Sequence, residues 1–517
     1  MTRLCRIGFV LTIVLGGVAC PRPSDTNQVG KRPAPGSRGH EAPVPLELTV
    51  LGEPGATTVS FRVGFRAGSA DDPAGKEGLT CLTAALILEG GTQRRTYGEL
   101  RKLLYPMAAE LGVECGKDHV AFVGRVHRDY VRKYLRLLGE VLIEPRFDPA
   151  AFKRLRQVAL DTVGRRLRFD NDQAVSEAAL DLLMYRDHPF RHPSFGTLVA
   201  LESLTLEDVK QQWLRVWTQE RLLAGVAGAV TRELQQNLTR ILRFLRPRGD
   251  PFKPLPAPKP IQGLHVRVIR KAGAASAISI GLPLRVTRAH PDYPALALAA
   301  SYLGEHGKSF GLLQRKMSAT RGLNHGTYAY VEHVEEEEHD RLPAVGVIRG
   351  LQRFLIAVRP VAPARAHFAV RFALRELKRL AGQGIPAQEF EQVRTFLSGY
   401  SRLWSQTTSR RLGHALDSRF YRAPGYPESL RTALARLTPE AVRQAVRRHL
   451  SPENLVVVVV SPEADKLAAA IRLDLPSPIT YGSPKPADVL AEDKIVATYR
   501  LAPAKVDVVA AEELFEN

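Results

Sequence analysis

The pattern of apolar and polar positions predicts the same succession of strand and helix twice along the chain. Thr58–Phe65 and Ser276–Leu282 have the short apolar runs of strands, and a polar turn follows each. Apolar segments long enough for buried helices come next, at Leu79–Leu88 and Tyr293–Leu303. Two similar halves are therefore expected.

The end of each half repeats as well. Residues 201–209 read LESLTLEDV and residues 434–442 read LARLTPEAV, so both fit Leu-x-x-Leu-Thr-x-Glu-x-Val. Thr205 and Thr438 suit the capping position at the start of a helix. An apolar run then predicts one strand in each half, at Leu222–Val230 and Leu455–Val460.

These repeats predict an α+β fold of two homologous domains, each an antiparallel-rich sheet with helices packed on one face. The chain of 517 residues is longer than a single core of roughly 250–300 residues allows. We expect a first repeat over 44–245, a Pro-rich linker over 246–262, a second repeat over 263–476 and a C-terminal tail over 477–517 that lies on the surface of the second half.

The first 43 residues predict export and a membrane anchor. Residues 1–20 combine a positive start, the apolar run Ile7–Val14 and small residues before Cys20, which is typical of a signal peptide. The end of this segment resembles a bacterial lipobox, which implies lipidation of Cys20 in the cell envelope. The alternative is an ordinary signal peptide with an incidental cysteine. Residues 21–43 are rich in Pro, Gly and Ser and predict a flexible tether.

Charge narrows the possible partners. Lys and Arg number 73 against 53 Asp and Glu, which gives a formal net charge of +20. No recognition-helix, zinc-finger or RNA-platform signature accompanies these charges, so no nucleic-acid partner is expected. A solvated basic surface that faces lipid headgroups or acidic peptides is the simpler interpretation.

Residues 78–92, GLTCLTAALILEGGT, resemble the zinc helix of insulinase/pitrilysin-type peptidases, whose pattern is G-L-x-H-x-x-E-H ending in Gly-Thr. Arg66-Ala67-Gly68-Ser69, His188-Pro189-Phe190 before Gly196, and Gly225-x-x-Gly228 resemble the same family. The resemblance covers residues 44–475. It implies two LuxS/peptidase-like metalloenzyme domains that form one half of a clamshell.

The functional groups of that helix are missing here. Histidines at i and i+4 of one helix face share a zinc ion, and the intervening Glu takes a proton from metal-bound water. The three positions are Cys81, Ala84 and Ala85, and alanine has no donor atom. The resemblance implies an acidic third ligand near Asp161. Cys81 and Asp161 alone fall short of four ligands, so neither a metal nor a catalytic residue is expected in this chain.

Simpler roles are open for both residues. Cys81 suits a small buried apolar position, and Asp161 suits a solvated or paired helix charge. Cys81 and Cys115 are the two cysteines of the body that could pair, although two cysteines do not make a disulfide framework.

Residues 304–328 resemble the family segment that holds the backbone or C-terminus of the substrate. The implied substrate-binding residues are Arg315, Arg321, Asn324 and His325. A carboxylate is a suitable ligand for such a group. The alternative is a structural turn held by Gly322 and Gly326.

Residues 332–339, EHVEEEEH, superficially resemble an inverted zinc motif through Glu335, Glu338 and His339. Nothing in the sequence shows that these side chains converge. An exposed acidic loop is the preferred interpretation.

The resemblance therefore favours a catalytically inactive subunit that completes the substrate chamber of an active zinc peptidase. The implied partners are that active chain, a peptide or unfolded protein substrate, and the membrane, with zinc only in the partner chain. Two alternatives remain: an active zinc metalloendopeptidase with atypical ligands, and an envelope peptide-binding or scaffold lipoprotein.

Overall fold

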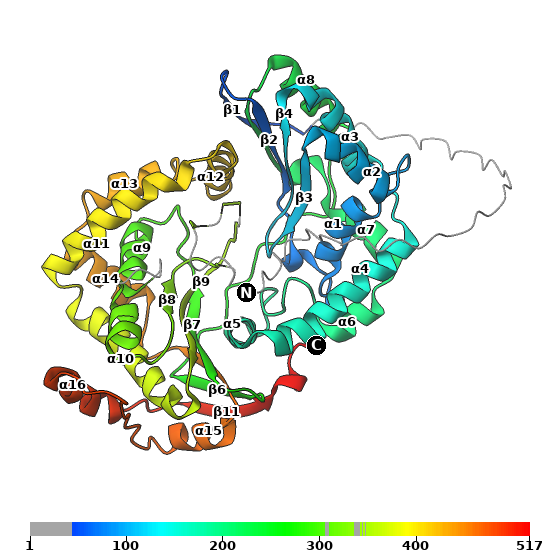
Figure 1. Cartoon of the computed structure of the whole chain (residues 1–517). Helices are drawn as coiled ribbons and strands as arrows, with labels where there is room; N and C mark the ends of the chain where they lie inside the picture. Colours follow the sequence, from blue (N-terminus) through cyan, green and yellow to red (C-terminus); the bar gives the residue numbers. More distant parts are fainter. Residues whose placement is uncertain (1–43, 305–309, 335–341, 344, 347) are drawn as a thin grey trace.

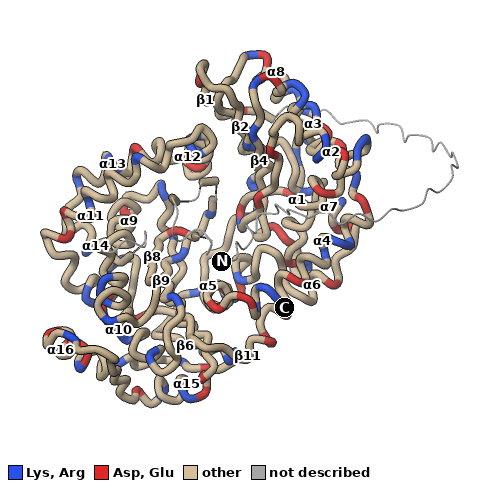
Figure 2. The backbone as a smooth tube through the Cα atoms, in the orientation of Figure 1, with Lys and Arg blue, Asp and Glu red and all other residues tan. Residues whose placement is uncertain are grey.

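The computed structural model describes residues 44–304, 310–334, 342–343, 345–346 and 348–517. The predicted signal peptide, Cys20 and the tether lie outside these residues. Two lobes, each with its own sheet, make up the body (Figure 1). Lys and Arg are spread over both lobes rather than gathered on one side of the tube in Figure 2.

The first sheet has five strands in the order β1-β5-β2-β4-β3. β1 runs parallel to β5, and the other neighbours are antiparallel. The strands are β1 (Leu48–Gly52), β2 (Thr58–Phe65), β3 (Glu110–Cys115), β4 (Val120–His127) and β5 (Leu222–Gly228).

The second sheet repeats this order as β6-β10-β7-β9-β8, with β6 parallel to β10 and the remaining pairs of this series antiparallel. Its strands are β6 (His265–Arg270), β7 (Ser276–Leu284), β8 (Thr327–Tyr330), β9 (Gln352–Val361) and β10 (Val456–Ser461). The matching order and directions confirm the predicted pair of homologous domains. A sixth strand, β11 (Lys505–Ala510), joins the outer edge parallel to β6.

The helices follow the same duplication. The first half contains α1 (Leu79–Glu89), α2 (Tyr97–Leu104), α3 (Val131–Ile143), α4 (Pro149–Asp161), α5 (Asp172–Met184), α6 (Leu198–Ser203), α7 (Leu206–Val216) and α8 (Arg232–Leu242). The second contains α9 (Tyr293–Leu303), α10 (Ala366–Gln383), α11 (Ala387–Tyr400), α12 (Thr408–Tyr421), α13 (Glu428–Leu434), α14 (Pro439–His449), α15 (Ala464–Arg472) and α16 (Ala487–Ala497). Thr205 and Thr438 cap α7 and α14, as predicted.

Each half places one helix on the sheet of the other half. α5 of the first half packs on β7 and β10, while α12 of the second half packs on β5 and β2. Leu223 and Ala227 of β5 form a buried cluster with Leu412 and Leu416 of α12. The prediction of helices on one face is therefore incomplete, because a helix from the other half covers the second face. The continuous apolar run of β10 suits a strand that is buried on both faces.

Much of the C-terminal tail lies on the second half, as expected, because α16 packs on α10 and β11 pairs with β6. Its last residues leave that half. After β11 the chain crosses to the first half, beside α6 (Figure 1). Leu514 and Phe515 are 4% and 2% exposed there. The guanidinium of Arg168 donates to the Leu514 carbonyl at 2.7 Å and pairs with Glu516 at 2.7 Å. The tail thus ties the two halves together.

Among the described residues, no helix has the length and apolar character needed to cross a membrane.

Candidate functional site

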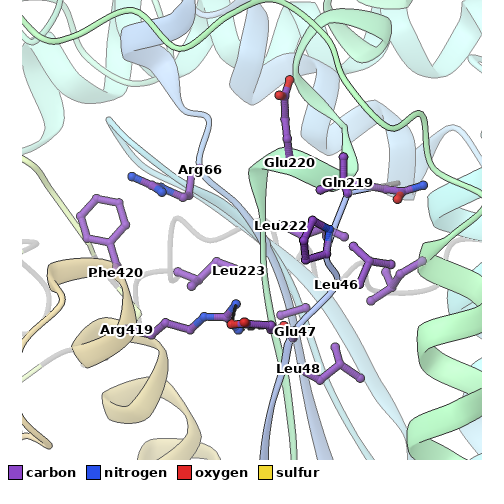
Figure 3. Close-up of a pocket in the computed structure, with 14 residues that line it drawn as sticks. Leu46, Glu47, Leu48, Arg66, Gln219, Glu220, Leu222, Leu223, Arg419 and Phe420 are labelled. Carbon is purple, nitrogen blue, oxygen red and sulfur yellow. Dashed lines mark hydrogen bonds and ion pairs between the residues drawn. The ribbon is translucent and has the colours of Figure 1, made fainter. Parts of the chain in front are cut away.

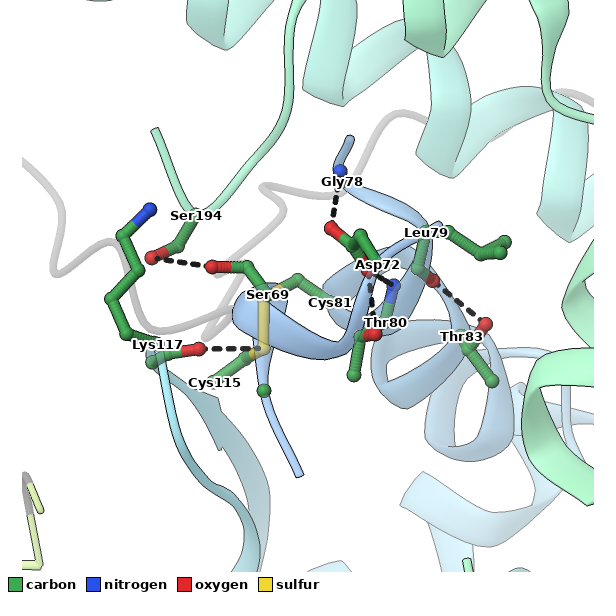
Figure 4. Close-up of a disulfide and its surroundings, with 12 residues drawn as sticks. Ser69, Asp72, Gly78, Leu79, Thr80, Cys81, Thr83, Cys115, Lys117 and Ser194 are labelled. Atoms are coloured by element: carbon green, nitrogen blue, oxygen red, sulfur yellow. Dashed lines mark hydrogen bonds between the residues drawn. A yellow bond between two sulfur atoms is a disulfide. The ribbon is translucent and has the colours of Figure 1, made fainter. Parts of the chain in front are cut away.

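The start of α1 is fixed by the carboxylate of Asp72, a half-buried residue. Asp72 accepts hydrogen bonds from the amides of Gly78 and Thr80, both at 2.7 Å, and from the Thr80 hydroxyl at 2.6 Å (Figure 4). Burial raises the pKa of Asp72 to about 7, against the opposing effect of the Thr80 hydrogen bonds. Gly78 has φ +100°, a conformation that glycine adopts without strain. The helix therefore begins at a defined position and direction.

A disulfide occupies the first position of the degenerate motif. Cys81 of α1 is bonded to Cys115 at the end of β3, with their Cα atoms 5.6 Å apart (Figure 4). Cys81 is buried, as the simpler interpretation expected, but it is also bonded to the other cysteine of the body that could pair. The bonded sulfur has no thiolate to offer, so Cys81 also does not act as the soft metal ligand that was considered.

The other two motif positions lie inside the core. Ala84 and Ala85 are 0% and 1% exposed. Ala84 packs with the apolar face of the first sheet, and Ala85 packs with Phe152 and Leu155 of α4. Apolar side chains thus fill the space between α1 and α4, where the family resemblance implies a zinc ion and a water molecule.

Asp161, at the position of the implied third ligand, forms ion pairs with two arginines of its own helical segment. Its carboxylate lies 3.0 Å from Arg165 Nε and 3.2 Å from Arg166 Nε. The hydrogen bond with Arg165 lowers the pKa of Asp161. This is the paired helix charge considered as the simpler role. Within the described residues, no trio of His, Cys, Asp or Glu close enough to hold an ion includes Cys81 or Asp161.

The candidate substrate-binding residues of the second half lie along one segment, and Arg321 is the most buried of them at 2% exposure. Its guanidinium pairs with Asp493 at 2.7 Å and with Glu492 at 2.8 Å, both on α16. Burial alone would raise the pKa of Glu492, but Lys316 and Arg321 hold it at about 2. Arg321 therefore anchors the C-terminal helix.

The other three candidates differ in their surroundings. Arg315 pairs with Glu389 of α11 at 3.2 Å. The side-chain amide of Asn324 donates to the Gly326 carbonyl at 2.6 Å and holds the turn that was the alternative interpretation. His325 is exposed. Substrate binding by these residues stays a prediction. His325 is exposed, and the paired side chain of Arg315 is 40% exposed.

The acidic segment is only partly within the described residues. Glu332 pairs with Arg288 at 2.8 Å, and Arg288 also contacts Asp417 of α12 at 3.0 Å. Glu332 therefore belongs to a buried ion-pair network, not to an exposed loop. Glu335, Glu338 and His339 lie outside the described residues.

A pocket that the sequence did not indicate lies beside the first residues of β1 and β5 in the first sheet (Figure 3). It has a volume of about 270 Å³ and is lined by the approach to β1, by β5 and by the end of α12. Arg419 and Glu47 pair across it at 3.0 Å. Five separate parts of the chain line this pocket, namely residues 44–48, Arg66, residues 219–224, Leu242 and residues 419–420, so no local pattern in the sequence could have revealed it.

The duplicated α+β fold, together with a zinc-type helix whose three motif positions hold a disulfide-bonded cysteine and two alanines, defines a metallopeptidase-like protein. Comparison with protein families agrees. The description "Insulinase (Peptidase family M16)" matches residues 49–197, and "Peptidase M16 inactive domain" matches residues 203–397. The chain belongs to the M16 peptidase family.

The relatives that this chain matches include a non-peptidase homologue, a subunit of a processing peptidase and an inactive domain. It is similar to a "Non-peptidase homolog YmxG" of Helicobacter pylori, with 20% identity over 78% of this chain and 88% of the relative. It is also similar to a probable mitochondrial-processing peptidase subunit beta of Schizosaccharomyces pombe, with 24% identity over 51% of this chain and 58% of the relative. The crystal structure of a peptidase M16 inactive domain from Pseudomonas fluorescens shares the fold, with a TM-score of 0.71 and 20% identity over 80% of this chain and 94% of that one.

Proposed function

We propose that this chain is a catalytically inactive M16 subunit that completes the substrate chamber of an active zinc-peptidase chain of the same family. The observation that carries the proposal is the segment Cys81–Ala85. One ligand position is locked in a disulfide, and the other two motif positions are buried alanines. A general base and a zinc-bound water are the two requirements of this chemistry, and the segment supplies neither.

The proposed partner supplies zinc and the reactive water, while this chain supplies one wall of the chamber and contacts with a peptide or unfolded protein. The similarity to a relative described as a subunit supports assembly with a second chain. The exposed His325 is the first candidate for contact with substrate.

Export and anchoring through Cys20 belong to the same proposal. The Cys81–Cys115 disulfide supports it, because disulfides persist mainly in oxidising compartments outside the cytosol. Replacing Cys20 with Ala should move the protein from the membrane fraction to the soluble fraction. Retention of the Cys20→Ala variant in washed membranes would contradict anchoring by this residue.

The partnership is tested by purifying the tagged full-length chain from membranes of its native host under mild detergent. We expect a second M16 chain with an intact H-x-x-E-H motif in near-stoichiometric amount, with peptidase activity, and the zinc that this activity needs, in that chain. Replacing the motif Glu of the partner with Gln is the matched control and should abolish cleavage while the complex stays intact.

The alternatives give distinct results in the same preparation. Stoichiometric zinc and peptide cleavage by this chain alone would establish an autonomous peptidase with atypical ligands. Recovery of this chain without any H-x-x-E-H chain would overturn the chamber proposal and favour a scaffold lipoprotein.

A further inference from the structure

Three side chains with metal-binding atoms meet at the contact between α9 and α14 in the second half. Asp292 directly precedes α9, His290 lies two residues earlier, and His449 is the last residue of α14. One ligand atom from each of the three lies within 4.8 Å of the other two. No part of the degenerate motif contributes to this cluster.

The packing holds the three residues in fixed positions. α9 packs directly against α14. His449 Nε2 lies 2.7 Å from Asp292 Oδ2, and His290 Nδ1 accepts the Asp292 amide at 3.0 Å. The two imidazole rings are 5.2 Å apart in an edge-to-face arrangement. All three residues are half-buried, so an ion that binds there reaches solvent from one side.

We infer that His290, Asp292 and His449 form a binding site for a divalent transition-metal ion, with Zn²⁺ as the best-matched ion. Two imidazoles and one carboxylate are a ligand set that zinc uses, and the open fourth position is filled by water. Ligand atoms of a tetrahedral zinc lie about 3.3 Å apart, so from the 4.8 Å limit these atoms need to close by up to about 1.5 Å, which side-chain rotation supplies. The harder ions Mg²⁺ and Ca²⁺ prefer all-oxygen sets and fit less well.

Arg448 competes with the ion. Its guanidinium pairs with the same Asp292 oxygen that faces His449. The Arg448 side chain is 57% exposed, so its release from Asp292 costs little free energy. Zn²⁺ would replace both the Arg448 cation and the His449 proton at this carboxylate. Arg448 therefore lowers the affinity of the site for zinc, and its substitution should strengthen zinc binding.

The site is tested on the full-length chain after removal of metals with a chelator. Zn²⁺ is titrated by calorimetry, and Co²⁺ is added as a spectroscopic probe of the ligand set. We expect one Zn²⁺ per chain. His449→Gln and His290→Gln should each weaken binding at least tenfold, because loss of a ligand costs no less than the roughly 10–100-fold loss on removal of an outer partner.

A matched control is available in the first half. His127 lies 3.3 Å from Asp129 but has no second histidine in reach of that pair among the described residues. His127→Gln should leave zinc binding unchanged, and Zn²⁺ should raise the melting temperature of this variant as it does for the parent chain. The shift should vanish in His449→Gln.

Arg448→Gln keeps the test decisive if the histidine variants fold poorly. It removes the competing cation without touching a ligand, so zinc affinity should rise several-fold. Three results would overturn the site. They are no zinc binding by the parent chain, zinc binding by the His290 and His449 variants as tight as that of the parent chain, or unchanged zinc affinity in Arg448→Gln. The last two would mark the cluster as an ion pair that only joins α9 to α14.

Discussion

Cys81 and Cys115 are bonded to each other at the place where the family resemblance implies the first zinc ligand. A zinc ion at that place would cross-link α1 to the third ligand near the end of α4. In this chain the cross-link is covalent and runs from α1 to β3 instead. The orientation of α1 is therefore fixed without a metal, and the alanines at positions 84 and 85 let the helix pack closely on both neighbours.

Removal of the disulfide should lower the stability of the first half. The bond closes a segment of 34 residues, for which the loop-entropy relation gives about 4 kcal/mol. The double substitution Cys81→Ala and Cys115→Ala should therefore lower the free energy of unfolding by about that amount and move the midpoint of denaturant unfolding to lower concentration. Reductant should produce a similar shift in the parent chain and none in the double variant. An unchanged midpoint in the double variant and in the reduced parent chain would show that the disulfide does not stabilise the fold.

Restoring the family motif should not restore the enzyme. The triple change Cys81→His, Ala84→Glu and Ala85→His inserts large polar groups where the two alanines are fully buried, and it frees Cys115. Asp161 is held by two arginines and would have to leave them to bind metal. We expect a destabilised protein that gains no zinc beyond the amount bound by the parent chain and shows no peptide cleavage, measured by metal analysis and a fluorogenic peptide. Full activity would show that the rest of the site is intact.

The duplicated elements could be predicted because each depends on local patterns. The strand Thr58–Phe65 and the helix Tyr293–Leu303 have the predicted bounds, since apolar periodicity ends where the chain turns polar. Thr205 and Thr438 gave the starts of two helices, because a capping hydroxyl acts within a few residues. The sequence likewise shows directly that Ala84 and Ala85 carry no metal-binding or proton-accepting side-chain atoms.

Contacts between distant segments could not be predicted in this way. The spacing of Cys81 and Cys115 does not reveal that β3 passes beside α1, so their pairing stayed open. The exchange of α5 and α12 depends on the relative placement of two lobes, which no local pattern encodes. Arg321 resembled a substrate-binding group because its acidic partners lie over 170 positions later, in a tail of weak periodicity.

The C-terminal segment should contribute strongly to the union of the two halves. Phe515→Ala removes a buried aromatic ring from the cluster that α4 and α5 share, which should cost about 3–5 kcal/mol. Leu490→Ala in α16 is the control, because Leu490 is 42% exposed and should change little. Limited proteolysis should cut the Phe515 variant earlier near α6. Equal stability of the two variants would exclude a fastening role for the tail.

Arg321 should act on stability before it acts on substrate. Arg321→Ala leaves the buried Asp493 without its cation, which should cost about 3 kcal/mol. His325→Ala should change stability by less than about 0.5 kcal/mol, since the side chain is exposed. Binding of a peptide to the assembled complex then separates the roles. Weaker binding in the stable His325 variant would support contact with substrate, and unchanged binding would argue against it.

Four buried histidines should make the fold sensitive to acid. Burial lowers the pKa of His119, His192 and His414 to about 3 and that of His367 to about 4. Below about pH 6.5 the unfolded chain binds a proton at each of these residues, whereas the folded chain stays neutral there. The free energy of unfolding should therefore fall as the pH falls from about 6.5 towards 4.

The contribution of one histidine can be isolated at His414, which is 1% exposed and whose Nε2 lies 3.2 Å from the Trp404 carbonyl oxygen. His414→Phe keeps a ring of similar shape and removes the titrating group. Denaturant unfolding between pH 7 and pH 4 should show a slope that is shallower by up to about 1.4 kcal/mol per pH unit in this variant. His325→Ala serves as the exposed control and should keep the parent slope. A His414→Phe slope equal to that of the parent would mean that His414 takes up its proton without unfolding the chain.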